Sequence, residues 1–155
     1  MSSVRIERAT AEKPEDALRL IEEYYDAVGV LARDDRETLL HYLADPQSAV
    51  WVAYVGPAPA GCILFRPLEH LRAAGEVKRL YVRPACRRHG VAALLLRALE
   101  QFATEHGISC LYLDSKDDLQ DAIAFYKRHG YTTCARYNDN PQATIFMRKT
   151  PHFVS

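Results

Sequence analysis

Long apolar runs are missing from this sequence of 155 residues. No stretch approaches the roughly 20 apolar residues that a helix needs to cross the hydrocarbon core of a bilayer. The first residues, Met1 to Arg5, also lack the apolar core of a secretory signal peptide. We therefore expect a cytoplasmic protein that has no membrane partner.

The sequence also lacks an excess of charge of either sign. Its 20 lysine and arginine residues and 20 aspartate and glutamate residues give a formal net charge of +0 at pH 7. A protein dedicated to nucleic acid gains affinity by neutralising phosphates with surplus cations. The balance argues against a nucleic-acid partner, so any site for a polyanion must be local.

Cysteine is sparse, and its pattern does not indicate a metal site. Cys62, Cys86, Cys110 and Cys134 are equally spaced, but their sequence contexts share no motif. None belongs to the Cys-x-x-Cys pair that is typical of structural zinc. We interpret them as unpaired thiols that pack as small hydrophobic side chains, and we expect no bound metal.

Length and composition indicate one globular domain over residues 1–155. Hydrophobic residues make up 48% of the chain and charged residues 26%, an ordinary balance for a folded protein. A chain of this length can bury one hydrophobic core but is short for two.

Hydrophobic periodicity predicts strands and helices that alternate along the chain. Strands are expected at residues 4–9, 49–55, 62–65, 76–82, 110–113, 132–137 and 143–148. Helices are expected at residues 14–25, 35–43, 91–102 and 119–129. This order predicts an α/β (α+β) fold with a central mixed, mostly antiparallel sheet of six to seven strands, flanked by about four helices. A parallel step is expected where the long helix joins two strands.

A basic segment, Arg87-Arg88-His89-Gly90-Val91-Ala92, joins a predicted strand to the long predicted helix. A helix N-terminus has unpaired backbone N–H groups and a partial positive charge, so it can hold a phosphate that approaches closely. Gly90 and Ala92 are small enough to permit that approach. From Val77 to Leu99 no residue is acidic, and the lysine and arginine residues are Lys78, Arg79, Arg83, Arg87, Arg88 and Arg97. The pattern indicates a local anion site, although a tight turn beside a solvated basic face would leave the same residues.

Arg87, Gly90 and Ala92 fit the pattern Arg or Gln, two residues, Gly, one residue, then Gly or Ala. The segment resembles the coenzyme A diphosphate loop of the GCN5-related N-acetyltransferase (GNAT) superfamily. The resemblance continues in the strand Leu111 to Asp114 and in the Phe125-Tyr126 pair of the next helix, which Gly130 closes. The Asn that often follows this strand in the family is absent, which puts one contact to the pantetheine in doubt.

The resemblance implies the GNAT fold and acetyl-CoA as co-substrate. Residues Leu80, Tyr81 and Val82 look like the family's fourth strand, which hydrogen-bonds the pantetheine arm and the thioester as an added strand would. Backbone N–H groups of Leu80 or Val82 would then stabilise the charge that develops on the thioester oxygen. The cofactor-binding residues that the resemblance implies are Leu80, Tyr81, Val82, Arg87, Arg88, His89, Gly90, Val91 and Ala92.

Acetyl transfer to an amine requires a neutral amine and a protonated leaving thiol. By resemblance to histone-type members of the superfamily, Glu76 is the expected general base, and Tyr126 is the expected general acid. Glu76 and Leu80 are four residues apart, so we expect them on one face of a strand, roughly 13 Å from each other. A water relay or a bulge would be needed to close that gap. Glu76 could equally begin an exposed strand, and Tyr126 could simply pack in the core.

The expected function is an N-acetyltransferase in which an amine attacks acetyl-CoA directly within a ternary complex. The amine would belong to a small molecule, a peptide or a protein, and Tyr24, Tyr25 and Tyr137 are the expected substrate-binding residues. A covalent route through Cys86 lacks a His-Asp partner pattern. The alternative from another class is a noncatalytic acyl-CoA-binding module, and the sequence leaves a homodimer open.

Overall fold

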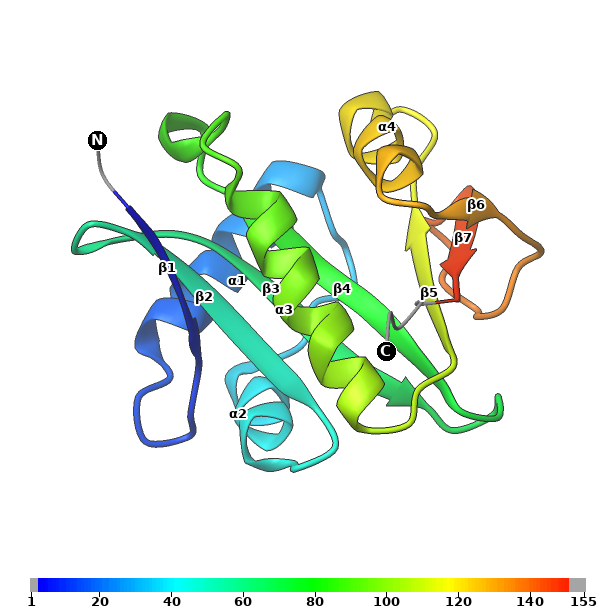
Figure 1. Ribbon diagram of the computed structural model, residues 1–155, viewed down its shortest axis with the longest axis horizontal. Helices are drawn as coiled ribbons and strands as arrows, with labels where there is room; N and C mark the ends of the chain where they lie inside the picture. Colours follow the sequence, from blue (N-terminus) through cyan, green and yellow to red (C-terminus); the bar gives the residue numbers. More distant parts are fainter. Residues whose placement is uncertain (1–2, 151–155) are drawn as a thin grey trace.

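The computed structural model describes residues 3–150, which form a seven-stranded sheet with helices on both faces (Figure 1). The strands are β1 (Val4–Arg8), β2 (Ala49–Val55), β3 (Ala58–Leu68), β4 (Ala74–Val82), β5 (Cys110–Ser115), β6 (Thr132–Thr133) and β7 (Ile145–Lys149). The α-helices are α1 (Glu15–Val28), α2 (Arg36–Ala44), α3 (Val91–Glu105) and α4 (Gln120–Arg128), and a short 3-10 helix spans Pro84–Cys86.

The strands lie in the order β1-β2-β3-β4-β5-β7-β6, and neighbours pair antiparallel except for β4 and β5. The mixed, mostly antiparallel sheet predicted from the sequence is confirmed. Its parallel step falls where α3 links β4 to β5, as predicted. β6 is shorter than predicted, because the chain beyond Thr133 turns into a loop whose side chains bond to other strands.

Two apolar clusters attach the helices to opposite faces of the sheet. Trp51 and Val52 are adjacent on β2, and strand alternation sends them to different clusters. Trp51 belongs to the cluster under α3 and α4, which includes Leu99, whereas Val52 joins Leu20 in the cluster under α1 and α2. In Figure 1, α3 accordingly crosses in front of β3 and β4, and α1 and α2 lie behind the sheet.

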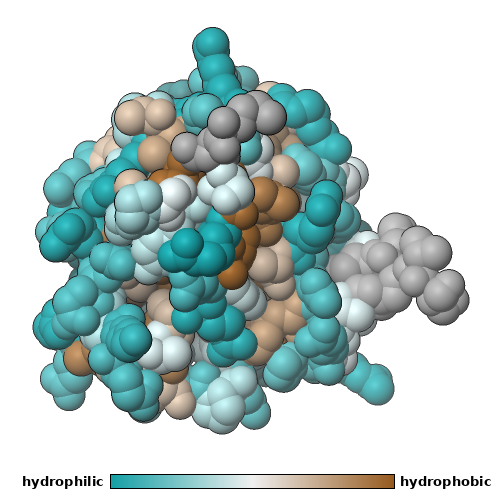
Figure 2. Space-filling model, turned by 60° about the vertical axis from the view of Figure 1, so that its left-hand side comes forward, coloured by the Kyte–Doolittle hydropathy of each residue, from teal (hydrophilic) through white to brown (hydrophobic). Residues whose placement is uncertain are grey.

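The surface is mainly polar. Figure 2 shows hydrophilic residues over most of the face in view, and apolar residues gathered mainly in one strip. Within residues 3–150, Leu31 in the loop after α1 is the one large apolar side chain classed as exposed, at 83%. Over the same residues, no helix combines the length and apolarity required to cross a bilayer.

β4 and β5 pair over a short distance and then separate. Their register joins Ala74, Gly75 and Glu76 to Cys110, Leu111 and Tyr112, and no later residue of β4 pairs with β5. The backbone groups of β4 that face β5 beyond this point therefore lack a strand partner, although the other edge stays paired with β3. This divergence leaves a free strand edge in the middle of the sheet.

β4 also carries a β-bulge. Between Lys78 and Tyr81 it has one more residue than the matching stretch of β3. Arg79 takes up the extra length with a φ of 59°, in the left-handed region that side chains rarely adopt. The expectation that Glu76 and Leu80 share a face is wrong, because the bulge reverses the alternation between them. Glu76 faces the α1 and α2 side, and Leu80 packs against the cluster under α3.

We expect the close packing of β3 against β4 to depend on Gly75. A Cβ at Gly75 would lie 2.2 Å from Cε1 of Phe65, a ring that is 1% exposed. Gly75→Ala should lower the free energy of unfolding by about 1–3 kcal/mol through overpacking, measured by urea denaturation. In a Phe65→Leu background the same change should cost less, because the ring is gone. Equal costs in both backgrounds would contradict this explanation.

Candidate active site

The N-terminus of α3 is an open cradle of backbone N–H groups. The first hydrogen bond of the helix runs from the Leu94 N–H to the Gly90 oxygen at 3.1 Å, so the preceding N–H groups have no helical acceptor. Arg88 and Gly90 have φ of 70° and 74°, which bends the loop around the helix end. No atom lies within 4 Å of the position that a Cβ at Gly90 would take. An open helix end of this kind can hold an anion, and the diphosphate site expected at the segment from Arg87 to Ala92 stays a prediction.

Arg87 ties this cradle to the end of β4. Its Nε donates to the Val82 oxygen at 3.1 Å. The hydrogen bond fixes the loop beside the free edge of β4, so the helix end and the strand edge form one continuous surface. The side chains of Arg88 and His89 are exposed in the same loop.

The free edge of β4 presents backbone donors. The Arg83 N–H points toward β3, where it donates to the Ala60 oxygen at 2.8 Å. Because N–H directions alternate along a regular strand, the N–H of Val82 points to the opposite edge. Tyr81 directs its side chain toward α1 and donates from its hydroxyl to Glu23 at 3.2 Å. Val82 can therefore offer an N–H group to a ligand lying along this edge, and the role expected for Leu80, which lies within the bulge, stays a prediction.

Tyr126 comes from α4 on the other side of the divergence, and in Figure 1 α4 lies beside β5, apart from α3. Its side chain is 8% exposed and packs edge-on against Tyr131, with ring centroids 5.6 Å apart. Burial raises the pKa of Tyr126, and nearby Tyr24 and Asp114 act in the same direction. The phenol stays protonated at neutral pH, as a proton donor must.

A cavity of about 410 Å³ opens on the α1 side of the same region. It is lined by Tyr24, Val28, Val30, Leu31, Ala32, Arg66, Lys78, Arg79, Asp114, Ser115, Lys116, Leu119, Asn138, Asp139, Asn140, Pro141, Gln142 and Ala143. Of the expected substrate-binding residues, Tyr24 lines this cavity. Tyr25 is 1% exposed and lies beneath Arg79, with the guanidinium 5.1 Å from the ring centroid. Tyr137 lines a neighbouring cavity of about 510 Å³, and Asn138 and Asp139 line both.

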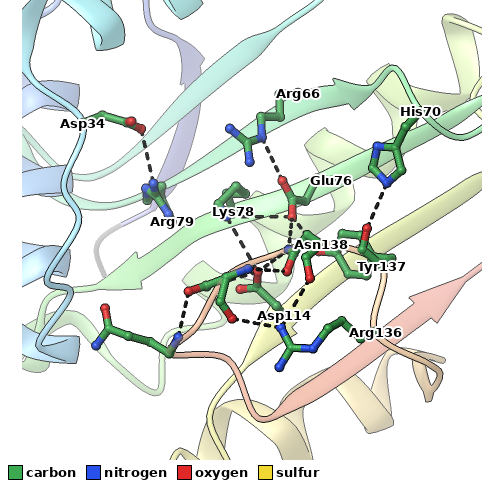
Figure 3. Close-up of polar contacts among 12 residues, drawn as sticks. Asp34, Arg66, His70, Glu76, Lys78, Arg79, Asp114, Arg136, Tyr137 and Asn138 are labelled. Carbon is green, nitrogen blue, oxygen red and sulfur yellow. Dashed lines mark hydrogen bonds and ion pairs between the residues drawn. The ribbon is translucent and has the colours of Figure 1, made fainter.

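Glu76 is 0% exposed and sits at the centre of a polar network (Figure 3). Its Oε1 accepts from Arg66 Nε at 2.8 Å, and its Oε2 accepts from the Tyr137 hydroxyl at 2.6 Å and from Asn138 Nδ2 at 3.2 Å. Glu76 is not among the residues that line the cavity of about 410 Å³ around Tyr24. Any proton exchange between Glu76 and a ligand there must pass through one of its partners.

Some residues of the site were not expected from the sequence. Asp114 Oδ2 accepts from Asn138 Nδ2 at 2.6 Å and from Asn140 Nδ2 at 3.3 Å, so the loop before β7 is held at the end of β5. Lys78 and Arg79 enter the same cavity from β4. Adjacent strand residues normally face opposite sides, and the sequence carries no signal of the bulge that brings this pair together. The acidic residues that begin at the end of β5, Asp114, Asp117 and Asp118, could have indicated Asp114.

Comparisons with known proteins identify relatives of this chain by sequence and by fold. The sequence model described as the acetyltransferase (GNAT) family matches residues 15–131. An uncharacterized N-acetyltransferase of Schizosaccharomyces pombe is 30% identical over 148 residues, 86% of each chain. A GNAT-family acetyltransferase from Staphylococcus aureus superposes with a TM-score of 0.81 at 18% identity, over 97% of this chain and 100% of that one. The PaiA N-acetyltransferase of Thermoplasma acidophilum, solved in complex with coenzyme A, gives a TM-score of 0.76 at 17% identity, over 96% and 99%.

The solved structures share the fold, and the family match covers most of the chain, including the diphosphate cradle, β4 and α4. The relative from Schizosaccharomyces pombe extends the similarity to nearly the whole sequence. The chain therefore belongs to the acetyltransferase (GNAT) family.

Proposed function

We propose that the protein transfers the acetyl group of acetyl-CoA directly to an amine. The observation that carries the proposal is the meeting of three features at one divergence of the sheet. Unpaired N–H groups begin α3, a strand edge without a strand partner runs beside them, and α4 supplies the buried, protonated phenol of Tyr126 near Asp114 of β5. Membership of the GNAT family supports the use of an acyl-CoA.

The residues proposed to hold acetyl-CoA divide by chemistry. N–H groups from Arg88 to Ala92 would bind the diphosphate, helped by the positive end of the helix dipole. Leu80 and Val82 would bind the pantetheine as an adjacent strand does, and their N–H groups would stabilise negative charge on the carbonyl oxygen. Acetyl-CoA supplies an acetyl group activated as a thioester.

Tyr126 is the proposed general acid. As the amine nitrogen bonds to the acetyl carbon, the carbon–sulfur bond breaks and the sulfur receives the phenolic proton. The nitrogen then loses a proton, which restores the phenol, so the products are an N-acetyl amine and a free thiol. A phenol suits this exchange because it is protonated at neutral pH and its oxygen can both donate and accept a proton.

Glu76 is the proposed general base, and it would act through Tyr137. The Tyr137 hydroxyl donates to Glu76 at 2.6 Å, so its oxygen can accept a proton while its own proton passes to the carboxylate. Arg66 holds the other carboxylate oxygen at 2.8 Å and fixes its direction. This route needs no contact between Glu76 and the amine, which its complete burial would prevent.

Release of free thiol tests the function. Acetyl-CoA incubated with a panel of amines should yield coenzyme A thiol only when protein and a suitable amine are both present. Tight acetyl-CoA binding without turnover of any amine, up to the pH where each amine is neutral, would instead support the noncatalytic acyl-CoA-binding module.

The same assay tests the cradle through Ala92→Asp. An acidic residue in the first turn favours the helix dipole but repels a diphosphate, and thermal melts of both variants measure any loss of stability, because Ala92 packs against the α3 cluster. The KM for acetyl-CoA should rise about 10-fold or more. Ala92→Ser, which adds no charge, is the matched control and should keep the wild-type KM. A normal KM in Ala92→Asp would place the diphosphate elsewhere.

Removing the phenolic proton should slow the chemical step. Tyr126→Phe should lower kcat by about 100-fold and leave the dissociation constant for acetyl-CoA nearly unchanged. Tyr131→Phe is the control, because its hydroxyl donates to Glu100 at 2.9 Å and has no part in the transfer. It should affect stability rather than kcat. An unchanged kcat in Tyr126→Phe would remove this residue from the mechanism.

Loss of the base should move the pH profile upward. A base lets the bound amine lose its proton at a pH below the pKa of the amine. Without the base, the protein is active only at a pH where the amine is already neutral in solution. Glu76→Gln and Tyr137→Phe should therefore both shift the rise of kcat/KM to higher pH. A shift in Glu76→Gln alone would exclude Tyr137 as the relay, and identical profiles in all three proteins would exclude the base role of Glu76.

A further inference from the structure

Two adjacent cations of β4 enter the cavity that Tyr24 lines. Lys78 and Arg79 would face opposite sides of a regular strand, and the positive φ of Arg79 turns both toward α1 (Figure 3). A non-glycine residue in the left-handed region is strained, and such strain points to a functional constraint. The bulge therefore concentrates positive charge in the acceptor cavity.

The Lys78 ammonium is not satisfied by its surroundings. Its side chain is 10% exposed, and the two nearest carboxylates, Glu76 Oε2 at 3.8 Å and Asp114 Oδ2 at 3.9 Å, lie beyond hydrogen-bonding distance. Both oxygens already accept shorter bonds, including one each from Asn138. Burial lowers the pKa of Lys78 although both carboxylates act to raise it. Its three donors are thus available to a ligand.

The hydrogen bonding of Arg79 is also incomplete. Within residues 3–150 its buried Nε has no hydrogen-bond partner, and one Nη donates to Asp34 at 3.2 Å. The guanidinium lies 5.1 Å from the Tyr25 ring centroid and 5.8 Å from that of Tyr24, which fixes its position. An ordered guanidinium and an ammonium without a close partner, both lining the same cavity, form a site for a compact anion.

Given the proposed function, on which this inference rests, we propose that the acceptor amine also carries a carboxylate, which Lys78 and Arg79 bind. The coenzyme cannot supply this anion, because its diphosphate cradle begins α3 on the opposite face of the sheet. A carboxylate would give Lys78 the hydrogen bonds that Glu76 and Asp114 leave unmade.

The apolar part of the cavity lining indicates the body of this acceptor. It comprises Val28, Val30, Leu31, Ala32, Leu119, Pro141 and Ala143, and the rest of the lining apart from Tyr24 is polar or charged: Arg66, Lys78, Arg79, Asp114, Ser115, Lys116, Asn138, Asp139, Asn140 and Gln142. Leu31 is 83% exposed at this wall, where an apolar ligand would cover it. A volume of about 410 Å³ suits a small molecule rather than a folded partner. The acceptor class is therefore an amino acid with an apolar side chain.

Three amines with the same apolar body test this assignment: L-phenylalanine, L-phenylalaninamide and 2-phenylethylamine. The kcat/KM for phenylalanine should exceed that for the amide by about 10- to 100-fold, the range expected for a charge-assisted contact. The amide has the less basic amino group, so chemistry alone favours the opposite order. Lys78→Met should bring the ratio close to one by raising the KM for phenylalanine, and Arg79→Gln should lower it independently.

Lys116→Met is the matched control. Lys116 also lines the cavity, but its ammonium already donates to the Val28 oxygen at 2.8 Å, so the ratio of acid to amide should stay as in the wild type. Equal use of acid and amide by the wild-type protein overturns the proposal. A preference that survives both Lys78→Met and Arg79→Gln also overturns it.

Calorimetric titration of the coenzyme A-saturated protein separates this inference from the proposed function. If none of the three amines is acetylated, the proposed function fails for this class of acceptor. The titration still tests whether Lys78 and Arg79 bind a carboxylate. Tighter binding of phenylalanine than of the amide, lost in Lys78→Met, supports the site, and equal or absent binding overturns it.

Discussion

The divergence of β4 from β5 is the constraint on which the rest of the site depends. Paired along their full length, the two strands would satisfy each other and leave no edge for a ligand. Pairing stops after Glu76, and the sheet keeps its integrity because β3 holds the other edge of β4. The apolar clusters on the two faces supply packing that stabilises the sheet where the hydrogen bonds between β4 and β5 are missing. The cost of an open edge inside a sheet is thus confined to a few residues.

The bulge in β4 gives the two faces of this opening different chemistry. On the α3 side, Leu80 and Val82 present apolar side chains, which suits the neutral pantetheine arm. On the α1 side, Lys78 and Arg79 place charge next to Asp114. One inserted residue therefore separates the proposed coenzyme surface from the proposed acceptor surface, and no loop is needed to divide them.

The network around Glu76 connects the proposed acceptor surface to the last part of the chain. Tyr137 and Asn138 lie in the loop between β6 and β7, and both donate to Glu76, while Asn138 also reaches Asp114 on β5. Arg66 completes the network from β3 and donates to Tyr42 on α2. A buried carboxylate needs such partners, because an isolated charge in this setting would be strongly destabilised. The same partners hold the loop against the cavity and fix the shape of its wall.

The sequence by itself determined the order of elements and the mixed sheet, because apolar periodicity is a local property of the chain, and its motifs at Arg87 to Ala92 and at Phe125-Tyr126 indicated the family. The diphosphate site at that loop stays a prediction. The sequence also led to the predictions that Glu76 is the general base, that Tyr126 is the general acid and that Tyr24 binds the acceptor. Only the tertiary structure decided that Glu76 is enclosed by Arg66 and Tyr137, and that Tyr25 lies under Arg79 rather than in the cavity. Those outcomes depend on contacts between residues far apart in the chain and on one bulge that reverses strand alternation. A one-residue shift in a strand leaves no trace in local periodicity, so the face on which Lys78 and Arg79 meet could be read only from the folded chain.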